Sequence, residues 1–268
     1  MNILIIGTEA TEQSLINLCL KSKHLDHIYT ASEKPLKEIP NIEYSDFQDL
    51  AHKAKTLQTD IVLVANKELI AEGLVDFLKK KRLNVISVNQ KWLNLENSRL
   101  IAKKLLNYYD IKTPEVLKAP IAFPVIIKTD KPNTTKIAYS MQELIEIKES
   151  LNNKKIFLEK HLNGETYYLL SLWDGQTAIH FKPESEFSEV QDYRLDFLKT
   201  KINFMLADEK PDFIGFFATK IIWAENDWHV LEFIMHLNKK SDLNSIKPDF
   251  LYLLNSAIYQ KLNEFKID

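Results

Sequence analysis

The stretch IFLEKHLNGETYYLLSLWDG, residues 156–175, decides the fold that we expect for this chain. Ile156–Leu158 is a short apolar run and Glu165–Trp173 is rich in Thr, Tyr and Leu, so both predict strands. Asn163-Gly164 between them and Asp174-Gly175 after them are turn dipeptides. Charged residues between two apolar strands indicate a place where backbone and polar side chains meet a ligand. The alternative is a plain β-hairpin with an exposed charged kink.

Composition bounds the class of protein. The 268 residues are 45% apolar and 27% charged, enough to build the core of one large domain or of two. The formal net charge is −2, so we expect no nucleic-acid partner and no membrane partner. The basic run at residues 79–82 is predicted to be a solvated helix end. A single cysteine, Cys19, excludes an internal disulfide framework, and no signal peptide or membrane span is expected, which predicts a cytoplasmic protein.

Glycine is scarce in this chain. There are 5 glycines in 268 residues, whereas an average protein has about 7%. Loops that wrap a triphosphate through backbone amides are usually rich in glycine. The count therefore argues against a full set of such loops.

Apolar runs alternate with helical patterns in the first part of the chain. Strands are expected at 1–7, 27–30, 59–65 and 84–88, and helices at 12–21, 47–57 and 68–81. This alternation predicts a small doubly wound α/β domain. The later elements are expected to be a helix capped by Asn97-Ser98 and running to Tyr109, paired strands at 125–128 and 137–140, helices at 141–151 and 192–207, paired strands at 213–223 and 228–233, and a helix at 250–265.

This order of elements resembles the phosphoribosylamine–glycine ligase family of the ATP-grasp superfamily over almost the whole chain. The segments that carry the resemblance are residues 3–7, 61–77, LENSR at 95–99, PVIIKTD at 124–130, EKHLNG at 159–164 and VLEF at 230–233. The resemblance implies an α/β fold, with a Rossmann-like pre-ATP-grasp domain at 1–95 and an α+β ATP-grasp domain at 96–268. Within the second domain it implies a linker helix at 96–110, a lid subdomain near 120–160 and a C-terminal subdomain near 161–268. The segment before Phe213 is expected to be shortened and the family's C-terminal domain to be absent.

The resemblance implies ATP as the cofactor. In that family an acidic residue and the backbone after it bind adenine at the hinge between the lid and the rest of the domain, and lysines neutralise the phosphates. The residues at matching or neighbouring positions are Arg99, Lys128, Lys136, Glu159, Lys160, His161, Leu162 and Glu165. They are our candidate nucleotide-binding residues.

Several positions depart from the family pattern. Thr166 stands where the family has an acid for the ribose hydroxyls, and Glu165 points to the other face of its strand. Ile137 replaces a glycine of the lid turn. Glu232 is the one remaining candidate ligand for Mg²⁺, because Ile234 replaces an asparagine that binds the ion.

The family's substrate-phosphate loop is altered too. Its G-x-G-G-R-E motif becomes GTEATE at residues 7–12, which puts the charge of Glu9 where a phosphate would sit. Its G-P-E motif becomes Ala65-Asn66-Lys67, and residues that follow the metal-binding strand become His236 and Lys239. Lys67 and Lys91 are expected to be solvated, with an unidentified anion as the alternative.

These departures lead us to expect a degenerate ATP-grasp protein, which is a weak nucleotide-binding or regulatory module without the family reaction. The alternative is an active, ADP-forming ATP-dependent carboxylate–amine ligase. That ligase would be either the glycinamide ribonucleotide synthetase of purine biosynthesis or an enzyme for another substrate. The expected partner is a nucleotide or another small molecule, a protein partner is left open, and no catalytic residue is assigned.

Overall fold

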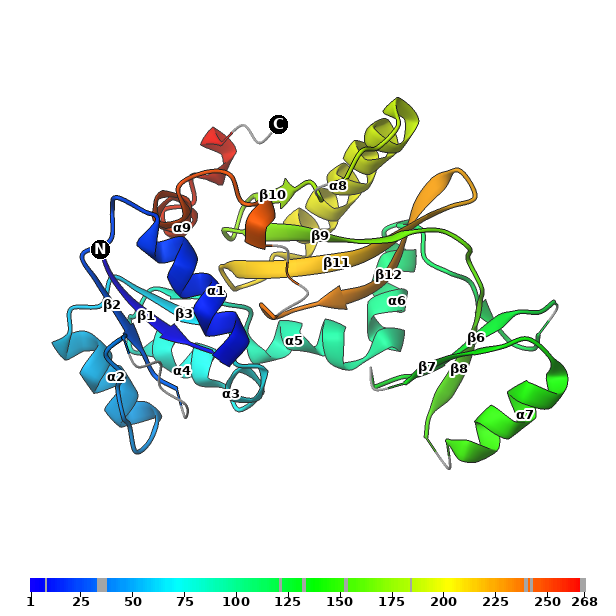
Figure 1. Cartoon of the computed structure of the whole chain (residues 1–268), viewed down its shortest axis with the longest axis horizontal. Helices are drawn as coiled ribbons and strands as arrows, with labels where there is room; N and C mark the ends of the chain where they lie inside the picture. The colour runs from blue at the N-terminus through cyan, green and yellow to red at the C-terminus, as the bar shows by residue number, and fades with distance from the viewer. Residues whose placement is uncertain are drawn as a thin grey trace.

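The computed structural model describes residues 1–7, 9–32, 38–120, 122–131, 134–151, 154–183, 185–238, 241 and 243–265, with Glu9 and Ala10 as backbone alone. Within these residues the strands form three four-stranded sheets (Figure 1). The first sheet lies at the end of the molecule that carries the N-terminus. The second lies in the middle, and the third lies at the opposite end.

The first sheet is parallel, with strand order β2-β1-β3-β4. Its strands are β1 (Asn2–Ile6), β2 (His27–Thr30), β3 (Ile61–Val64) and β4 (Val85–Ile86), and its helices are α1 (Glu9–Leu20), α2 (Phe47–Thr56), α3 (Lys67–Ala71) and α4 (Leu74–Lys80). The predicted alternation is confirmed, but the predicted helix at 68–81 is divided into α3 and α4. Gly73 separates them because its φ of +91° is left-handed and cannot continue a right-handed helix.

The second, central sheet is antiparallel, with order β10-β9-β11-β12. It consists of β9 (Thr166–Trp173), β10 (Ala178–Phe181), β11 (Gly215–Ala224) and β12 (Asp227–Ile234), with α8 (Glu189–Glu209) and α9 (Phe250–Ile258) in the same part of the chain. The predicted pair of strands around residue 225 is confirmed. The predicted final helix is shorter than expected, because α9 ends at Ile258 and a separate 3₁₀ helix follows at Leu262–Glu264. A second 3₁₀ helix lies at Leu243–Ser245.

The third sheet, which we call the lid after the subdomain predicted near residues 120–160, has order β5-β8-β6-β7 and antiparallel pairing. Its elements are β5 (Val116–Leu117), β6 (Val125–Thr129), β7 (Thr135–Ala138), α7 (Met141–Ser150) and β8 (Ile156–Lys160). Two helices, α5 (Gln90–Asn97) and α6 (Arg99–Tyr108), lead into it where one linker helix was expected. Ser98 ends α5 in an extended conformation and caps α6, because its hydroxyl accepts the Ile101 N–H.

The two strands of the opening stretch belong to different sheets. β8 pairs with β5 and β6 in the lid, whereas β9 pairs with β10 and β11 in the central sheet. The plain-hairpin alternative is therefore wrong, and residues 161–165 form a hinge between two sheets. The turn predicted at Asp174-Gly175 does close a hairpin, between β9 and β10, with Gly175 at a φ of +97°.

The described residues bury three apolar clusters. Two of them combine strands and helices of the first sheet with those of the central sheet, and the third consists of lid residues alone. The first and central sheets also meet through their backbones, since the Ser87 N–H donates to the Ile214 carbonyl at 2.7 Å. Gly215 follows this contact, and a Cβ there would lie 2.6 Å from the Ser87 carbonyl carbon. Close packing thus joins these two sheets into one body.

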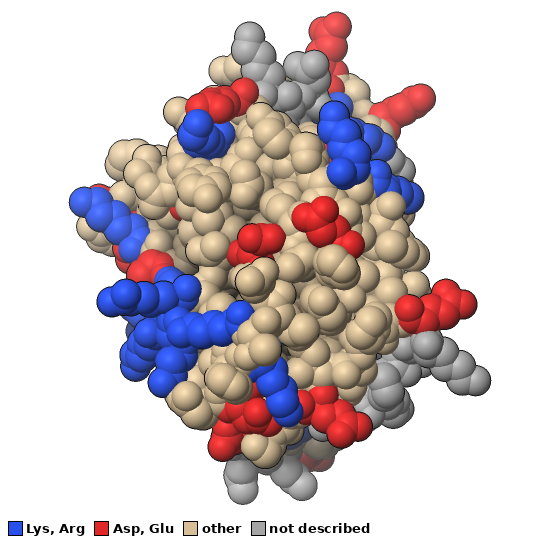
Figure 2. Space-filling model, turned by 90° about the vertical axis from the view of Figure 1, so that its left-hand side faces the viewer, with Lys and Arg blue, Asp and Glu red and all other residues tan. Residues whose placement is uncertain are grey.

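The remaining surface features are ordinary. Lys79 and Lys80 lie in the last turn of α4, so the predicted helix end is confirmed, and Lys79 donates to the Asp212 carbonyl. On the end of the molecule shown in Figure 2, basic side chains gather toward one edge with acidic ones nearby, on a mainly uncharged surface.

Cys19 is fully buried, and burial raises the pKa of its thiol to about 12. No described helix is both long enough and apolar enough to span a bilayer.

A buried histidine in the central sheet makes folding depend on pH. His180 bonds to Ser171 Oγ at 2.7 Å and to Asn203 Oδ1 at 3.1 Å, and burial lowers its pKa to about 4. An unfolded histidine titrates near pH 6.5, so below that pH the unfolded chain binds a proton that the folded chain does not. The free energy of unfolding is therefore unaffected by His180 titration above about pH 6.5, and it decreases as the pH falls from about 6.5 toward 4.

We therefore expect the His180→Gln variant to lose stability less steeply in acid. Between about pH 6.5 and pH 4, its free energy of unfolding should fall by up to ~1.4 kcal/mol less per pH unit than that of the unmodified chain. Urea denaturation at a series of pH values measures both slopes. Parallel slopes for the two proteins would show that His180 does not cause the acid sensitivity.

Candidate functional site

A cleft of about 340 Å³ lies between the lid and the central sheet. Apolar side chains from both sheets and from the hinge line it, namely Pro114, Ile126, Ile137, Leu162, Ile222 and Leu231. Six of the candidate residues also line it, namely Lys128, Glu159, Lys160, His161, Leu162 and Glu232. Apolar walls with a few polar groups suit a flat ring that carries a charged tail.

The acid at the hinge is buried between two lysines. Glu159 is 1% exposed, with Oε1 2.8 Å from Lys103 Nζ and Oε2 2.7 Å from Lys128 Nζ. Lys103 also donates to Thr113 Oγ1 at 2.8 Å and to the Pro114 carbonyl at 2.7 Å. Burial lowers the pKa of Lys103, and the Glu159 charge opposes that effect. Sequence reasoning gave Lys103 no role, although its place one turn after Arg99 on a helix was a usable signal.

The rest of the hinge presents backbone rather than charge. The Lys160 N–H donates to the Glu115 carbonyl at 2.9 Å, and its ammonium group forms an ion pair with Glu225. His161 and Leu162 follow β8, belong to no strand, and line the cleft. Their peptide groups are therefore outside the sheet ladders and are the ones placed to meet a ligand.

Strand alternation carries Lys136 away from the cleft. Its neighbours Thr135 and Ile137 both line the cleft, so the Lys136 side chain lies on the other face of the lid sheet. There its Nζ is 3.4 Å from Ser150 Oγ of α7. This candidate does not join the others.

Glu165 also lies away from the cleft, on the opposite face as its strand position predicts. Its carboxylate accepts a hydrogen bond from the Tyr167 hydroxyl at 2.5 Å, and it lines a neighbouring surface hollow with Tyr167. Thr166 lines the cleft instead. A neutral hydroxyl thus stands at the ribose position that the resemblance implies.

The implied metal position holds other cations. Glu232 Oε2 lies 3.2 Å from Arg99 Nη2, and Oε1 lies 3.9 Å from Lys220 Nζ. Ile234 shares the face of Glu232, as alternation predicts, but it is buried in a core cluster with Leu170 and Ala218. Among the described residues no group of three His, Cys, Asp or Glu side chains is close enough to hold a metal. Glu232 is thus a carboxylate of the cleft that already contacts two cations, whereas Mg²⁺ in proteins is commonly held by one or two carboxylates together with phosphate oxygens and water.

In the first domain the Glu12 carboxylate accepts the hydrogen bond of the Gly7 amide, which by the resemblance would bind a substrate phosphate. The Gly7 N–H donates to Glu12 Oε1 at 3.2 Å, and Glu12 is fully buried. Burial raises the pKa of Glu12, while hydrogen bonds from Ser32 and the Gly7 amide oppose that effect. Thr8, the Glu9 side chain and Lys239 lie outside the described residues.

Lys67 is not simply solvated as expected. Its Nζ lies 2.7 Å from Glu96 Oε1, while Glu96 Oε2 accepts from the Met235 N–H at 2.7 Å and contacts His236 Nδ1 at 2.8 Å. Burial favours the neutral carboxyl, but His236 and Lys67 together hold the pKa of Glu96 below its ordinary value. Lys91 lies apart, at a surface groove beside Trp92. Glu96 of α5 thus joins Lys67 of α3 to the segment after β12.

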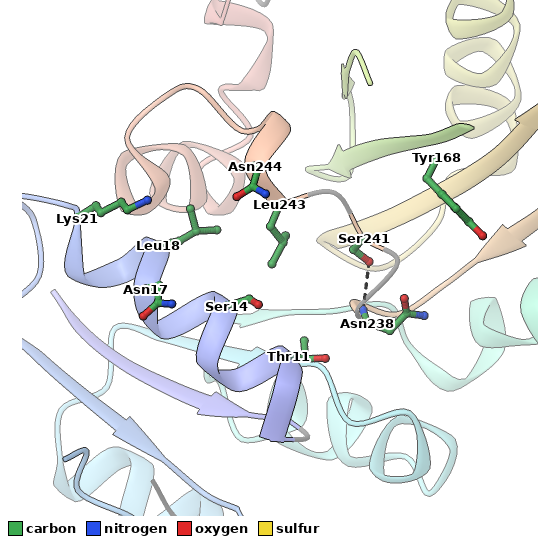
Figure 3. A pocket seen from close by; sticks show the side chains of 10 residues that line it. All are labelled: Thr11, Ser14, Asn17, Leu18, Lys21, Tyr168, Asn238, Ser241, Leu243 and Asn244. Atoms are coloured by element: carbon green, nitrogen blue, oxygen red, sulfur yellow. Dashed lines mark hydrogen bonds between the residues drawn. The ribbon is translucent and has the colours of Figure 1, made fainter. Parts of the chain in front are cut away.

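A second, larger cavity of about 560 Å³ opens between α1 and the segment after β12 (Figure 3). Side chains of α1 line one side, and Asn238, Ser241 and Asn244 line the other. Tyr168 reaches it from β9, two residues after Thr166, so the cleft and this cavity lie along one face of the central sheet. Hydroxyls and amides dominate its lining, which suits a small polar ligand.

Comparison with known proteins gives these observations a context. The family model for the N domain of phosphoribosylglycinamide synthetase matches residues 1–96. The phosphoribosylamine–glycine ligase of Fusobacterium nucleatum is 24% identical over 322 aligned residues, which cover the whole chain and 76% of that enzyme. The corresponding enzyme of Clostridium acetobutylicum is 21% identical over 327 residues, with 100% and 77% covered. Both alignments are longer than the chain itself, so these relatives contain internal segments that it lacks.

Solved structures show the same fold. The phosphoribosylamine–glycine ligase of Thermotoga maritima matches with a TM-score of 0.72 at 17% identity, covering the whole chain and 77% of that enzyme. The D-alanine–D-alanine ligase of Bacillus anthracis, complexed with ATP, matches with a TM-score of 0.62 at 20% identity, covering 99% and 100%. The predicted α/β class, with a Rossmann-like first domain, is confirmed.

Proposed function

We propose, for a chain related over its whole length to the phosphoribosylamine–glycine ligases, that it binds an adenine nucleotide between lid and central sheet and lacks the family reaction. The proposal rests on the cleft itself, where apolar walls lie next to the hinge peptides of His161 and Leu162, which belong to no sheet. The part of the cleft beside the hinge has the apolar walls and the backbone groups that an adenine ring needs. The half beyond it has Thr166 at the ribose position and a carboxylate that is already paired with cations.

The second candidate is an active ATP-dependent ligase. One observation favours it, namely that Lys103, Glu159 and Lys128 form a complete buried cluster at the hinge. A ligase needs such cations to position phosphates. Release of ADP from ATP with Mg²⁺ and a carboxylate substrate would support this candidate against the first.

Titration with ATP by calorimetry tests the binding proposal. We expect a dissociation constant of about 0.1 mM or weaker, equivalent to roughly −5.5 kcal/mol, because the ribose contact is reduced. The Leu231→Trp variant should weaken binding by more than about tenfold, since an indole would fill the apolar slot. Leu20→Trp, an exposed leucine on α1, is the control. Equal binding by Leu231→Trp and the control, or no binding by the unmodified chain, would refute a nucleotide site in this cleft.

A further inference from the structure

Arg99 connects the lid to the central sheet. It is the first residue of α6 and is 8% exposed. Its Nη1 donates to the carbonyl of Thr129 at 3.2 Å and to that of Thr134 at 2.9 Å, and its Nη2 bonds to Glu232 at 3.2 Å. One guanidinium therefore connects the end of β6 and the residue before β7 to β12. A cation at the start of a helix is unfavourable for the helix dipole, so these contacts must hold it there.

The charges near Glu232 oppose the entry of another cation. Its two oxygens lie 3.2 Å from Arg99 and 3.9 Å from Lys220. A divalent ion at this carboxylate would stand close to both positive groups, and like charges repel strongly where burial reduces screening. A metal at Glu232 Oε2 would have to displace Arg99 Nη2 from that oxygen.

Positive charge is in excess on this wall of the site. Lys128 and Lys220 line the cleft, and the buried Arg99 and Lys103 lie behind the lining and contact its carboxylates Glu232 and Glu159. The wall is therefore positive before any ligand enters. Its charge is complementary to that of an anion and repels a metal ion.

One N–H group of the Arg99 guanidinium is not used in these contacts. Its Nε is buried and has no hydrogen-bond acceptor among the described residues. A buried N–H without an acceptor is unfavourable, and a guanidinium binds phosphate oxygens especially well. An anionic oxygen at this place would satisfy the donor.

Resting on the proposed nucleotide function, we infer that Arg99 replaces the divalent cation, and that the cleft binds the phosphates of a metal-free nucleotide. The ligand class is a nucleoside diphosphate or a similar polyphosphate that is not complexed with Mg²⁺. Arg99, Lys128 and Lys220 supply the positive charge that a metal supplies elsewhere. Mg²⁺ should compete with the protein for the phosphates rather than join the two.

The test is calorimetric titration of the full chain with ADP, once with EDTA and once with millimolar Mg²⁺, and with adenosine in parallel. We expect tighter binding of ADP with EDTA, and at least about tenfold tighter binding of ADP than of adenosine. Stronger binding with Mg²⁺ than with EDTA would overturn the inference, as would equal binding of ADP and adenosine. If neither ligand binds, the proposed function itself fails, so the two failures are distinguishable.

A variant pair assigns the effect to Arg99. Arg99→Gln should lose about tenfold in ADP affinity with EDTA and keep its adenosine affinity, which also shows that the variant is folded. Lys148→Gln removes an exposed cation of α7 in the same lid and should change neither affinity. ADP binding by Arg99→Gln equal to that of the Lys148→Gln control would overturn the inference. The comparison between EDTA and Mg²⁺ needs no variant and stands by itself.

Discussion

Glu159→Gln should lower the free energy of unfolding by about 3–5 kcal/mol, because removing one partner of a buried charge cluster leaves the others uncompensated. Glu159 is 1% exposed and contacts both Lys103 and Lys128, which are also buried. Glutamine keeps the shape and removes the charge. Lys103 retains Thr113 and the Pro114 carbonyl, so Lys128 should be the more affected lysine.

Urea denaturation followed by circular dichroism measures this loss. The matched control is Glu225→Gln, which breaks the neighbouring ion pair with Lys160, where both side chains are about half exposed. An exposed pair contributes less than about 1 kcal/mol, so the control should stay close to the unmodified chain. Similar small losses for both variants would show that the buried lysines tolerate the missing charge.

Gly164→Ala should cost about 3 kcal/mol and also remove nucleotide binding, because overpacking of this kind displaces backbone. A Cβ at this position would lie 2.0 Å from the Trp223 carbonyl oxygen, and that oxygen belongs to β11 and cannot rotate away. The hinge and the central sheet would have to separate. Since the hinge carries His161 and Leu162 into the cleft, the site should be distorted as well.

The measurements are thermal unfolding and ATP titration of the same variant. Asn163→Ala, one residue earlier and exposed, should change stability by less than about 0.5 kcal/mol. A stable Gly164→Ala protein with unchanged ATP affinity would mean that the hinge moves without cost. Gly164 is one of only five glycines in the chain, and its place against β11 requires the absence of a Cβ. None of the five lies in the turn between β6 and β7.

Local patterns predicted the elements of the fold better than their partners. Continuous apolar runs predicted β1 and β3 because parallel strands are buried on both faces. The two-residue strand β5 has too little pattern to be seen, and α5 was missed because its sequence passes directly into the cap of α6. That β8 and β9 join different sheets is a tertiary fact, and alternation within a strand cannot give it.

For the site, the hinge motif picked out residues that the fold brings to one cleft, because they are neighbours in the chain; their role in binding a nucleotide stays a prediction. Glu159, His161 and Leu162 all line the cleft. Lys136 does not, because the positions on either side of it take the cleft face of β7. The pairing of Arg99 with Glu232 joins residues 133 positions apart in the chain, and no local pattern carries such a contact.

The separate core of the lid has a consequence for motion. Six buried residues form that cluster, and all of them belong to the lid, whereas the other two clusters hold the first and central sheets together. Small, self-contained units open with less free energy than the whole protein. Amide protons of β6 and β7 should therefore exchange with solvent sooner than those of β1 or β11, and they should do so without global unfolding. We therefore expect the lid to move as a unit relative to the central sheet, and the contacts of Arg99 with Glu232 of β12 to restrain that motion.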